Sequence, residues 1–453
     1  MVPAGGRPWK DWMNAMNDFQ KTAKEMLDFI TKSPTCFHAA ANIGELLEKA
    51  GFRELKENEE WTLKRGGRYY TKRNDSSVIA FAIPAEENDI RGFHMAAAHS
   101  DSPCFKIKEK PELMVEEHYL RLNTEKYGGM ILSTWLDRSL SVAGRLAVRK
   151  ESGIESRLVN IDRDLCVIPN VAIHMNREMN KGMEYNPQVD MLPLFADAAF
   201  TAPEDTEATS GKMTLRTLAA EAAGVDAETI LGEDLFLYTR QEGKFLGARG
   251  EFVLSPRLDD LQSAFALTKA FVASEPAEYI NLCAVFDNEE VGSGTRQGAD
   301  STFLEDVLQR ITEGLQESHG TYLRWVAGSF LISADNAHAV HPNHPEKADP
   351  TNRPYLNGGI VIKYHGSQKY TTDGISAARM KDYCERAKVP YQTYANRSDI
   401  AGGSTLGNIS TAHVSVSSVD IGLPQLAMHS AVETAGMKDT EYAVRALKEF
   451  WSE

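Results

Sequence analysis

The chain has 453 residues, of which 42% are hydrophobic and 25% are charged. These proportions are typical of a folded globular protein and exclude a disordered chain, a collagen-like repeat and a coiled-coil rod. With 49 Lys and Arg against 64 Asp and Glu, the formal net charge is −15. An acidic chain without a basic block is a poor ligand for nucleic acid or for an anionic membrane surface, so we expect neither as a partner.

Cysteine usage and hydropathy indicate the compartment. The five cysteines are an odd number, are widely scattered and include no Cys-x-x-Cys pair, which is typical of reduced thiols in a cytoplasmic protein. Residues 1–7 are not followed by the apolar core of a secretory signal. No apolar stretch approaches the ~20 residues that a membrane span requires. We therefore expect a soluble, cytoplasmic protein.

The first hundred residues alternate helix and strand signals. Apolar residues recur at helical spacing over residues 12–30 and 39–50. Short apolar runs at 78–83 and 93–98 predict buried strands.

The middle third of the chain lacks this alternation. From residue 103 to 233, short mixed segments and a polar, acidic tract at 203–207 interrupt any strand–helix order. We interpret residues 103–233 as a smaller domain inserted into a larger one that consists of residues 1–102 and 234–453.

The alternation then returns and continues to the end of the chain. It predicts an α/β sheet covered by helices on both faces, with no internal repeat. Either Asp439 or Thr440 is a plausible N-cap for the final helix. The predicted helices are 258–273 and 441–451, and the predicted strands are 279–286, 330–334, 359–364 and 413–421.

Acidic and histidine side chains follow the ends of the predicted strands. In an open α/β sheet, the carboxyl ends of the strands border the crevice in which ligands bind. Asp259 and Asp260 open the predicted helix at 258–273. The residues that follow strand ends are His99, Asp101, Glu289, Glu290, Asp335 and His429.

Two histidines with several carboxylates and no cysteine form a nitrogen and oxygen donor set that suits Zn, Co or Mn. One histidine and one carboxylate for each ion, with a shared Asp, would hold two ions ~3.5–4 Å apart. In the Glu289–Glu290 pair, one carboxylate can bind metal while the other accepts a proton from water. Asp101 is placed to accept the second N–H of His99 and to fix its tautomer. Taken singly, these residues also fit a solvated acidic turn or a helix N-terminus.

Five segments together resemble the aspartyl aminopeptidase family of two-metal exopeptidases. The resemblance extends from about residue 20 to the C-terminus. It implies a zinc-peptidase-like three-layer αβα sandwich with an inserted, smaller dimerisation domain. The segments are AHSDSP at 98–103, SPRLD at 255–259, FDNEEVGS at 286–293, SADNAHAVHPN at 333–343 and MHS at 428–430.

The resemblance also implies roles for individual residues. The peptide bond that follows the shared ligand Asp259 is expected to be cis. Glu289 is expected to be the general base that deprotonates the bridging water, which attacks the first peptide carbonyl. The implied ligands of one divalent ion are His99, Asp259 and Asp335, and those of the other are Asp259, Glu290 and His429.

The resemblance implies that Lys363 and Tyr370 determine substrate specificity. They resemble family residues that surround the side chain of the substrate's first residue. A chain of net charge −15 repels acidic peptides at long range, so a preference for Asp or Glu requires a local cation such as Lys363. Lys363 could also simply end a strand at the surface. The family's usual Arg-Tyr pair is Lys369-Tyr370 here. His174, in the insert, resembles a residue that reaches the neighbour's substrate across a dimer interface.

These features predict a metal-dependent aminopeptidase that removes N-terminal residues, preferentially Asp or Glu, from short or unfolded peptides. The resemblance implies homodimers that assemble into a tetrahedral dodecamer and a Gly-rich loop at 400–407 that lines the site. Two alternatives stay open. One is an aminopeptidase for neutral residues, or a small-molecule amidase, with the same two-metal site. The other is a catalytically silent homo-oligomeric assembly protein.

Overall fold

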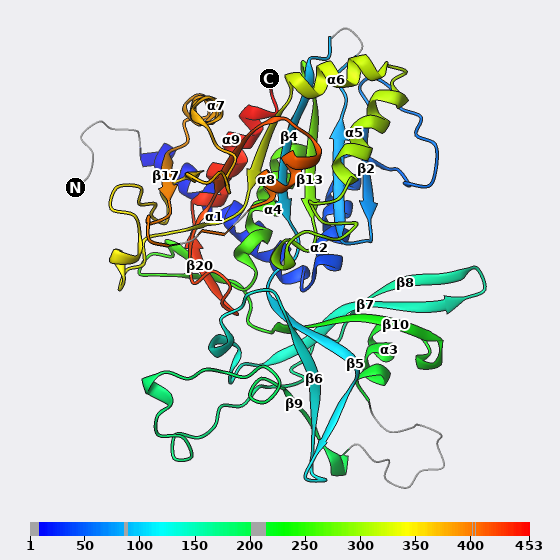
Figure 1. Cartoon of the computed structure of the whole chain (residues 1–453), viewed down its shortest axis with the longest axis vertical. Coiled ribbons are helices and arrows are strands. Elements are labelled where there is room, and N and C mark those ends of the chain that lie inside the picture. Colours follow the sequence, from blue (N-terminus) through cyan, green and yellow to red (C-terminus); the bar gives the residue numbers. More distant parts are fainter. Residues whose placement is uncertain (1–8, 86–88, 201–213, 401, 404) are drawn as a thin grey trace. The chain divides into compact units, whose positions relative to one another are not determined.

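The computed structural model describes residues 9–85, 89–200, 214–400, 402–403 and 405–453. The expectations for residues 1–7 and for the acidic tract at 203–207 lie outside these ranges. The chain divides into two compact units (Figure 1). The first unit comprises Met1–Asp101, Gly243–Met428 and Glu433–Glu453, and the second comprises Ser102–Glu242 and His429–Val432.

A nine-stranded sheet forms the centre of the first unit. Its short apolar strands are almost wholly buried, as expected for strands covered on both faces. The strand order is β1 (Arg53–Glu54), β2 (Arg68–Arg73), β3 (Ser77–Ala82), β13 (Tyr279–Phe286), β4 (Gly92–His99), β14 (Phe330–Ala334), β18 (Ser417–Gly422), β16 (Ile360–Tyr364) and β17 (Tyr391–Ala395).

Helices cover both faces of this sheet, because successive side chains of each strand point to opposite sides. In β4, Ala96 and Ala98 join one hydrophobic core, whereas Met95 and Ala97 join the other. The first unit is therefore the three-layer αβα sandwich that the sequence predicted (Figure 1). The first core packs against α1 (Trp9–Lys32), α2 (Cys36–Lys49), α4 (Leu258–Val272), α7 (Gly374–Arg386) and α9 (Asp439–Phe450), and the second against α5 (Phe303–Gly314), α6 (His319–Gly328) and α8 (Leu406–His413).

Two predictions near the C-terminus were wrong in detail. The strand expected at 413–421 begins at Ser417, because His413 is the last residue of α8. Asp439 is a residue of α9, and Lys438 occupies the N-cap position. The Asp439 carboxylate instead accepts the backbone N–H groups of Asn357 and Gly359, at 2.7 and 2.9 Å. A tertiary contact has therefore replaced the local cap.

A smaller five-stranded sheet completes the first unit. It places Glu433 opposite Ser255, three residues before the first residue of α4. The strand order is β11 (Lys244–Leu246), β12 (Phe252–Ser255), β20 (Glu433–Gly436), β19 (Pro424–Leu426) and β15 (Ala337–His338).

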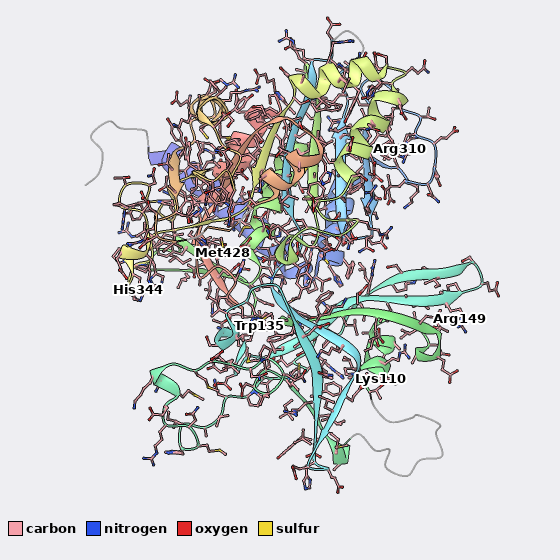
Figure 2. All side chains as sticks on the ribbon, viewed as in Figure 1. Lys110, Trp135, Arg149, Arg310, His344 and Met428 are labelled. Atoms are coloured by element: carbon pink, nitrogen blue, oxygen red, sulfur yellow. The ribbon has the colours of Figure 1, made fainter. Side chains whose placement is uncertain are left out.

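The second unit contains a six-stranded antiparallel sheet, which explains why its sequence lacks the strand–helix alternation. Its core includes Trp135, which is labelled in Figure 2. The Trp135 ring meets the ring of Phe105 edge to face at 5.3 Å. The sheet order is β8 (Gly153–Asn160), β7 (Leu140–Lys150), β10 (Ile230–Thr239), β5 (Cys104–Val115), β6 (Tyr119–Tyr127) and β9 (Leu194–Asp197), and α3 (Leu215–Ala223) packs into the same core.

The expected end of the insert, at about residue 233, falls inside β10. That strand continues to Thr239 and stays paired with β7 as far as Leu140, so the unit ends at Glu242. The role of this unit in dimerisation stays a prediction. None of the five cysteines, all of which lie in the described ranges, forms a disulfide bond. Among the described residues, no helix is long and apolar enough to cross a membrane.

Candidate metal centre

Three neighbouring parallel strands bring the candidate ligands to one edge of the large sheet. β4 pairs in parallel with β13 on one side and with β14 on the other. His99, the last residue of β4, is in register with Phe286, the last residue of β13. Asp335 directly follows β14, and Glu289 and Glu290 follow β13. These residues therefore stand at, or shortly after, the carboxyl ends of three adjacent strands.

His99, Asp259 and Asp335 form a compact group at this edge. One ligand atom from each lies within 4.8 Å of the others. The Nε2 atom of His99 is 3.4 Å from Asp259 Oδ1 and 4.0 Å from Asp335 Oδ1. Ligands ~2.0–2.1 Å from a tetrahedral zinc ion stand roughly 3.3 Å apart, so this donor set fits zinc in both chemistry and spacing.

The glutamate pair also faces His99. His99, Glu289 and Glu290 offer ligand atoms that lie within 4.8 Å of one another. Asp101 holds this pair in place, because its two carboxylate oxygens accept the backbone N–H groups of Glu289 and Glu290, both at 3.1 Å. The sequence had not indicated this role of Asp101.

Asp101 also orients His99. The Nδ1 atom of His99 lies 3.1 Å from the main-chain oxygen of Asp101 and 3.3 Å from its carboxylate Oδ1. Both oxygens are acceptors, so they favour the tautomer with hydrogen on Nδ1. This tautomer leaves Nε2, which faces Asp259 and Asp335, as the nitrogen available to a metal.

The start of α4 has an unusual backbone conformation. The peptide bond between Asp259 and Asp260 is cis, as the resemblance implied. The N–H of Asp259 donates to Glu433 Oε2 at 3.0 Å, and Asp260 Oδ2 accepts the N–H of His99 at 3.3 Å. Glu433 and Asp260 thus support the candidate ligands, and only Asp260 had been noticed in the sequence, as a neighbour of Asp259.

Burial dominates the electrostatics of this cluster. It raises the pKa of Asp260 and of Glu290 well above the ordinary range, and neighbouring carboxylates add to the effect. Burial also raises the pKa of Glu289 to about 8, with His99 opposing the rise and Asp335 adding to it. For His99, burial favours the neutral ring, but Asp101 and Asp259 outweigh it and raise the pKa. Without a metal, the cluster therefore tends to hold protons, and a divalent cation would offset the same concentrated negative charge.

Lys363 lies beside this cluster and not at the surface, so the surface interpretation was wrong. Its side chain is only 2% exposed, and its Nζ is 3.4 Å from Asp335 Oδ2 and 5.6 Å from the centre of the Tyr370 ring. Burial disfavours the charged amine, but Asp335 outweighs burial and raises the pKa of Lys363. Lys369 donates to the main-chain oxygen of Gly402 at 2.9 Å.

The two remaining candidate residues belong to the second unit. His429 Nδ1 lies 2.9 Å from the main-chain oxygen of Gly129, which favours Nε2 as its metal-binding nitrogen. His174 lies in an exposed segment. The proposed roles of both histidines stay predictions.

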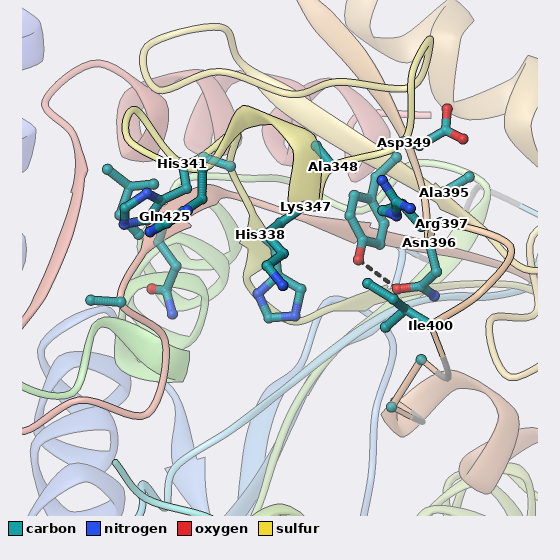
Figure 3. A pocket seen from close by; sticks show the side chains of 17 residues that line it. His338, His341, Lys347, Ala348, Asp349, Ala395, Asn396, Arg397, Ile400 and Gln425 are labelled. Carbon is teal, nitrogen blue, oxygen red and sulfur yellow. Dashed lines mark hydrogen bonds between the residues drawn. The ribbon is translucent and has the colours of Figure 1, made fainter. Parts of the chain in front are cut away.

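A cavity of about 430 Å³ lies within the first unit (Figure 3). Its lining includes His338 of β15, Gln425 of β19, and Asn396, which accepts a hydrogen bond from the Tyr394 hydroxyl at 2.6 Å (Figure 3). Gln425 Oε1 accepts the side-chain N–H of Asn336, the residue after Asp335, at 2.9 Å. The wall of the cavity is therefore hydrogen-bonded to the segment that carries a candidate ligand.

Known proteins resemble this chain over nearly its whole length. Residues 29–451 match the family model described as aminopeptidase I zinc metalloprotease (M18). A probable M18 family aminopeptidase 2 from Clostridium novyi (strain NT) is 47% identical, over 95% of this chain and 99% of its own. A protein of the same description from Pseudomonas savastanoi pv. phaseolicola (strain 1448A / Race 6) is 40% identical, over 94% of this chain and 97% of its own.

Solved structures also resemble this chain over nearly its whole length. A chain in the cryo-EM structure of the Ape4 and Nbr1 complex has a TM-score of 0.91 and 36% identity, over 96% of this chain and 86% of that one. A chain in the structure of the S. cerevisiae mApe1 dodecamer has a TM-score of 0.82 and 28% identity, over 96% of this chain and 97% of that one. The chain therefore belongs to the aminopeptidase I (M18) family of zinc metalloproteases and is a metal-dependent aminopeptidase.

Proposed function

We propose that this aminopeptidase releases N-terminal Asp and Glu from peptides. The observation that carries the proposal is the buried ammonium group of Lys363, which lies 3.4 Å from Asp335 and close to the ring of Tyr370. An unsolvated cation beside the candidate metal ligands favours a substrate carboxylate, which would otherwise be repelled by a chain of net charge −15.

We further propose two zinc ions in each subunit. One would be held by His99, Asp259 and Asp335, whose ligand atoms already lie within 4.8 Å of one another. The other would be held by Asp259, Glu290 and His429. Zinc at this site would polarise the peptide carbonyl and activate water for attack.

Glu289 is the proposed general base. Its backbone is held by Asp101, and its side chain lies among the candidate ligands without being needed in either ligand set. In this role, a carboxylate oxygen of Glu289 accepts a proton from the attacking water and passes it to the nitrogen of the leaving amine. Asp101 contributes by positioning both His99 and Glu289.

Self-assembly through the second unit is part of the proposal. A dodecamer is recorded for a solved relative, S. cerevisiae mApe1. The second unit exposes several large apolar side chains, which contact with another subunit would remove from water. We propose homodimers that form a tetrahedral dodecamer, with His174 reaching the substrate of the neighbouring subunit, so that only short or unfolded peptides enter. The apolar side chains are Ile154, Leu158, Met175, Val189 and Leu231.

Turnover of aminoacyl p-nitroanilides by the zinc-loaded enzyme tests the specificity. We expect kcat/KM for the Asp and Glu substrates to exceed that for the Leu substrate by at least about tenfold, which corresponds to ~1.4 kcal/mol. Faster release of Leu would favour the aminopeptidase for neutral residues. Turnover of N-acetyl amino acids in place of anilides would favour the amidase.

A further inference from the structure

A buried asparagine contacts both segments that carry the proposed aspartate ligands. Asn336 directly follows Asp335 and is 2% exposed. Its side-chain nitrogen lies 3.0 Å from the main-chain oxygen of Leu258, the residue before Asp259. The same nitrogen lies 3.1 Å from Gln262 Oε1 and 2.9 Å from Gln425 Oε1. Three acceptors therefore share its two N–H bonds and fix the orientation of the amide.

The partners of Asn336 extend this contact into a network. Gln425 Nε2 donates to Glu433 Oε1 at 3.4 Å, and Glu433 Oε2 accepts the N–H of Asp259 at 3.0 Å. Ser263 donates to the side-chain oxygen of Asn336 at 3.3 Å. All of these side chains are buried. The network thus connects the residue after Asp335 to the peptide bond that precedes the Asp259 α-carbon, at both its C=O and its N–H.

Such a network matters because the two aspartates come from separate elements, the end of β14 and the start of α4. A fully hydrogen-bonded group inside a protein is rigid, and its members lose much of their stabilisation when one of them is removed. Residues that hold metal ligands in place, without touching the metal, commonly change metal affinity by about 10–100-fold when they are mutated.

We infer that Asn336 is a positioning residue of the metal centre: its amide sets the spacing of Asp259 and Asp335, and through that spacing the affinity for zinc. The inference rests on the proposed assignment of these two aspartates as ligands. It also connects the metal centre to the cavity of Figure 3, because Gln425 belongs both to the network and to the cavity wall.

The chain offers a matched control for loss of a buried amide. Asn281, in β13 of the same unit, is 1% exposed, and its side-chain nitrogen donates to the main-chain oxygen of Trp451 at 2.7 Å. Substitution of either asparagine removes a buried hydrogen bond and lowers stability. Only Asn336 contacts the candidate ligand segments.

The test is a zinc titration of the metal-free full-length protein against a competing chelator, with thermal unfolding measured in parallel. For Asn336→Ala and Asn336→Leu, we expect zinc affinity to fall about 10–100-fold. For Asn281→Ala and Asn281→Leu, we expect lower unfolding temperatures with the zinc affinity of the parent protein. Neither measurement depends on the activity of the loaded enzyme.

Two results would overturn the inference: Asn336 variants that bind zinc as tightly as the parent, or Asn281 variants that lose as much affinity. If the Asn336 variants do not fold, Gln425→Leu, which removes the link to Glu433, must weaken zinc binding for the inference to stand. Asp335→Ala distinguishes a failure of the ligand assignment from a failure of the role given to Asn336. If it binds zinc like the parent, the ligand assignment fails. If it alone binds zinc weakly, the assignment stands and the role of Asn336 fails.

Discussion

Substitution of Lys363 by Met tests how the site selects acidic substrates. The Lys363 side chain is buried, and Met keeps most of its unbranched stem while removing the charge. Two interactions change at once. The variant loses the 3.4 Å ion pair with Asp335, and it loses the cation proposed to face the substrate carboxylate.

The two losses differ in which substrates they affect. A charge pair at 3.4 Å has a Coulomb energy of about 5 kcal/mol at an effective dielectric constant of 20, before solvation is counted. That loss affects every substrate equally. A hydrogen bond to a charged group contributes about 1.5–3 kcal/mol, and this second loss is restricted to substrates with an N-terminal Asp or Glu. The ratio of the Asp to the Leu rate should therefore fall roughly 10- to 150-fold.

The assay is kcat/KM of the zinc-loaded enzyme for Asp and Leu p-nitroanilides. Lys269→Met serves as the control, because it removes a lysine of the same unit whose Nζ pairs with Glu25 and which has no proposed role in the site. We expect this control to keep the ratio of the parent enzyme. An unchanged ratio in Lys363→Met, even with both rates lowered, would refute the proposed specificity role.

Three further predictions concern the base, the metal and the fold. Glu289→Gln should retain zinc by elemental analysis yet lose activity by a factor of ~10² or more, and near-normal turnover would exclude Glu289 as the base. Chelation should abolish turnover and added zinc should restore it, whereas turnover that survives complete zinc removal would contradict a metal-dependent reaction. Burial lowers the pKa of His94 to about 3, so folding keeps this ring neutral. Below pH 6.5 the unfolded chain takes up a proton on this histidine and the folded chain does not, so acid destabilises the fold. In denaturant titrations, lowering the pH from 6.5 to 4.5 should therefore cost the parent protein about 2 kcal/mol more stability than it costs His94→Phe. Equal losses in the two proteins would contradict this.

The central strands could be predicted because both of their faces are buried. β13 and β14 occupy the residues that the apolar runs indicated, and β4 differs by one residue at each end. Parallel pairing of these strands then brings His99, Glu289, Glu290 and Asp335 together, so strand ends were enough to predict much of the site.

Features that depend on distant partners could not be predicted in this way. Asn336 stands in a segment that was noticed, but its partners Gln262 and Gln425 are 74 and 89 residues away in the chain. Glu433, which accepts from Gln425, is 97 residues away. No local sequence pattern shows that the amides of Gln262 and Gln425 and the carboxylate of Glu433 belong to one network. The sequence could not give the exact end of the insert for the same reason, because the pairing of β10 with β7 is non-local.

Zinc-edge anomalous diffraction from crystals of the zinc-loaded enzyme tests the central claim most directly. We expect two zinc peaks in each subunit, ~3.5–4 Å apart, on either side of Asp259. One peak should contact His99 and Asp335, and the other should contact Glu290 and His429. A single peak, or peaks that these side chains do not contact, would contradict the proposed two-metal centre.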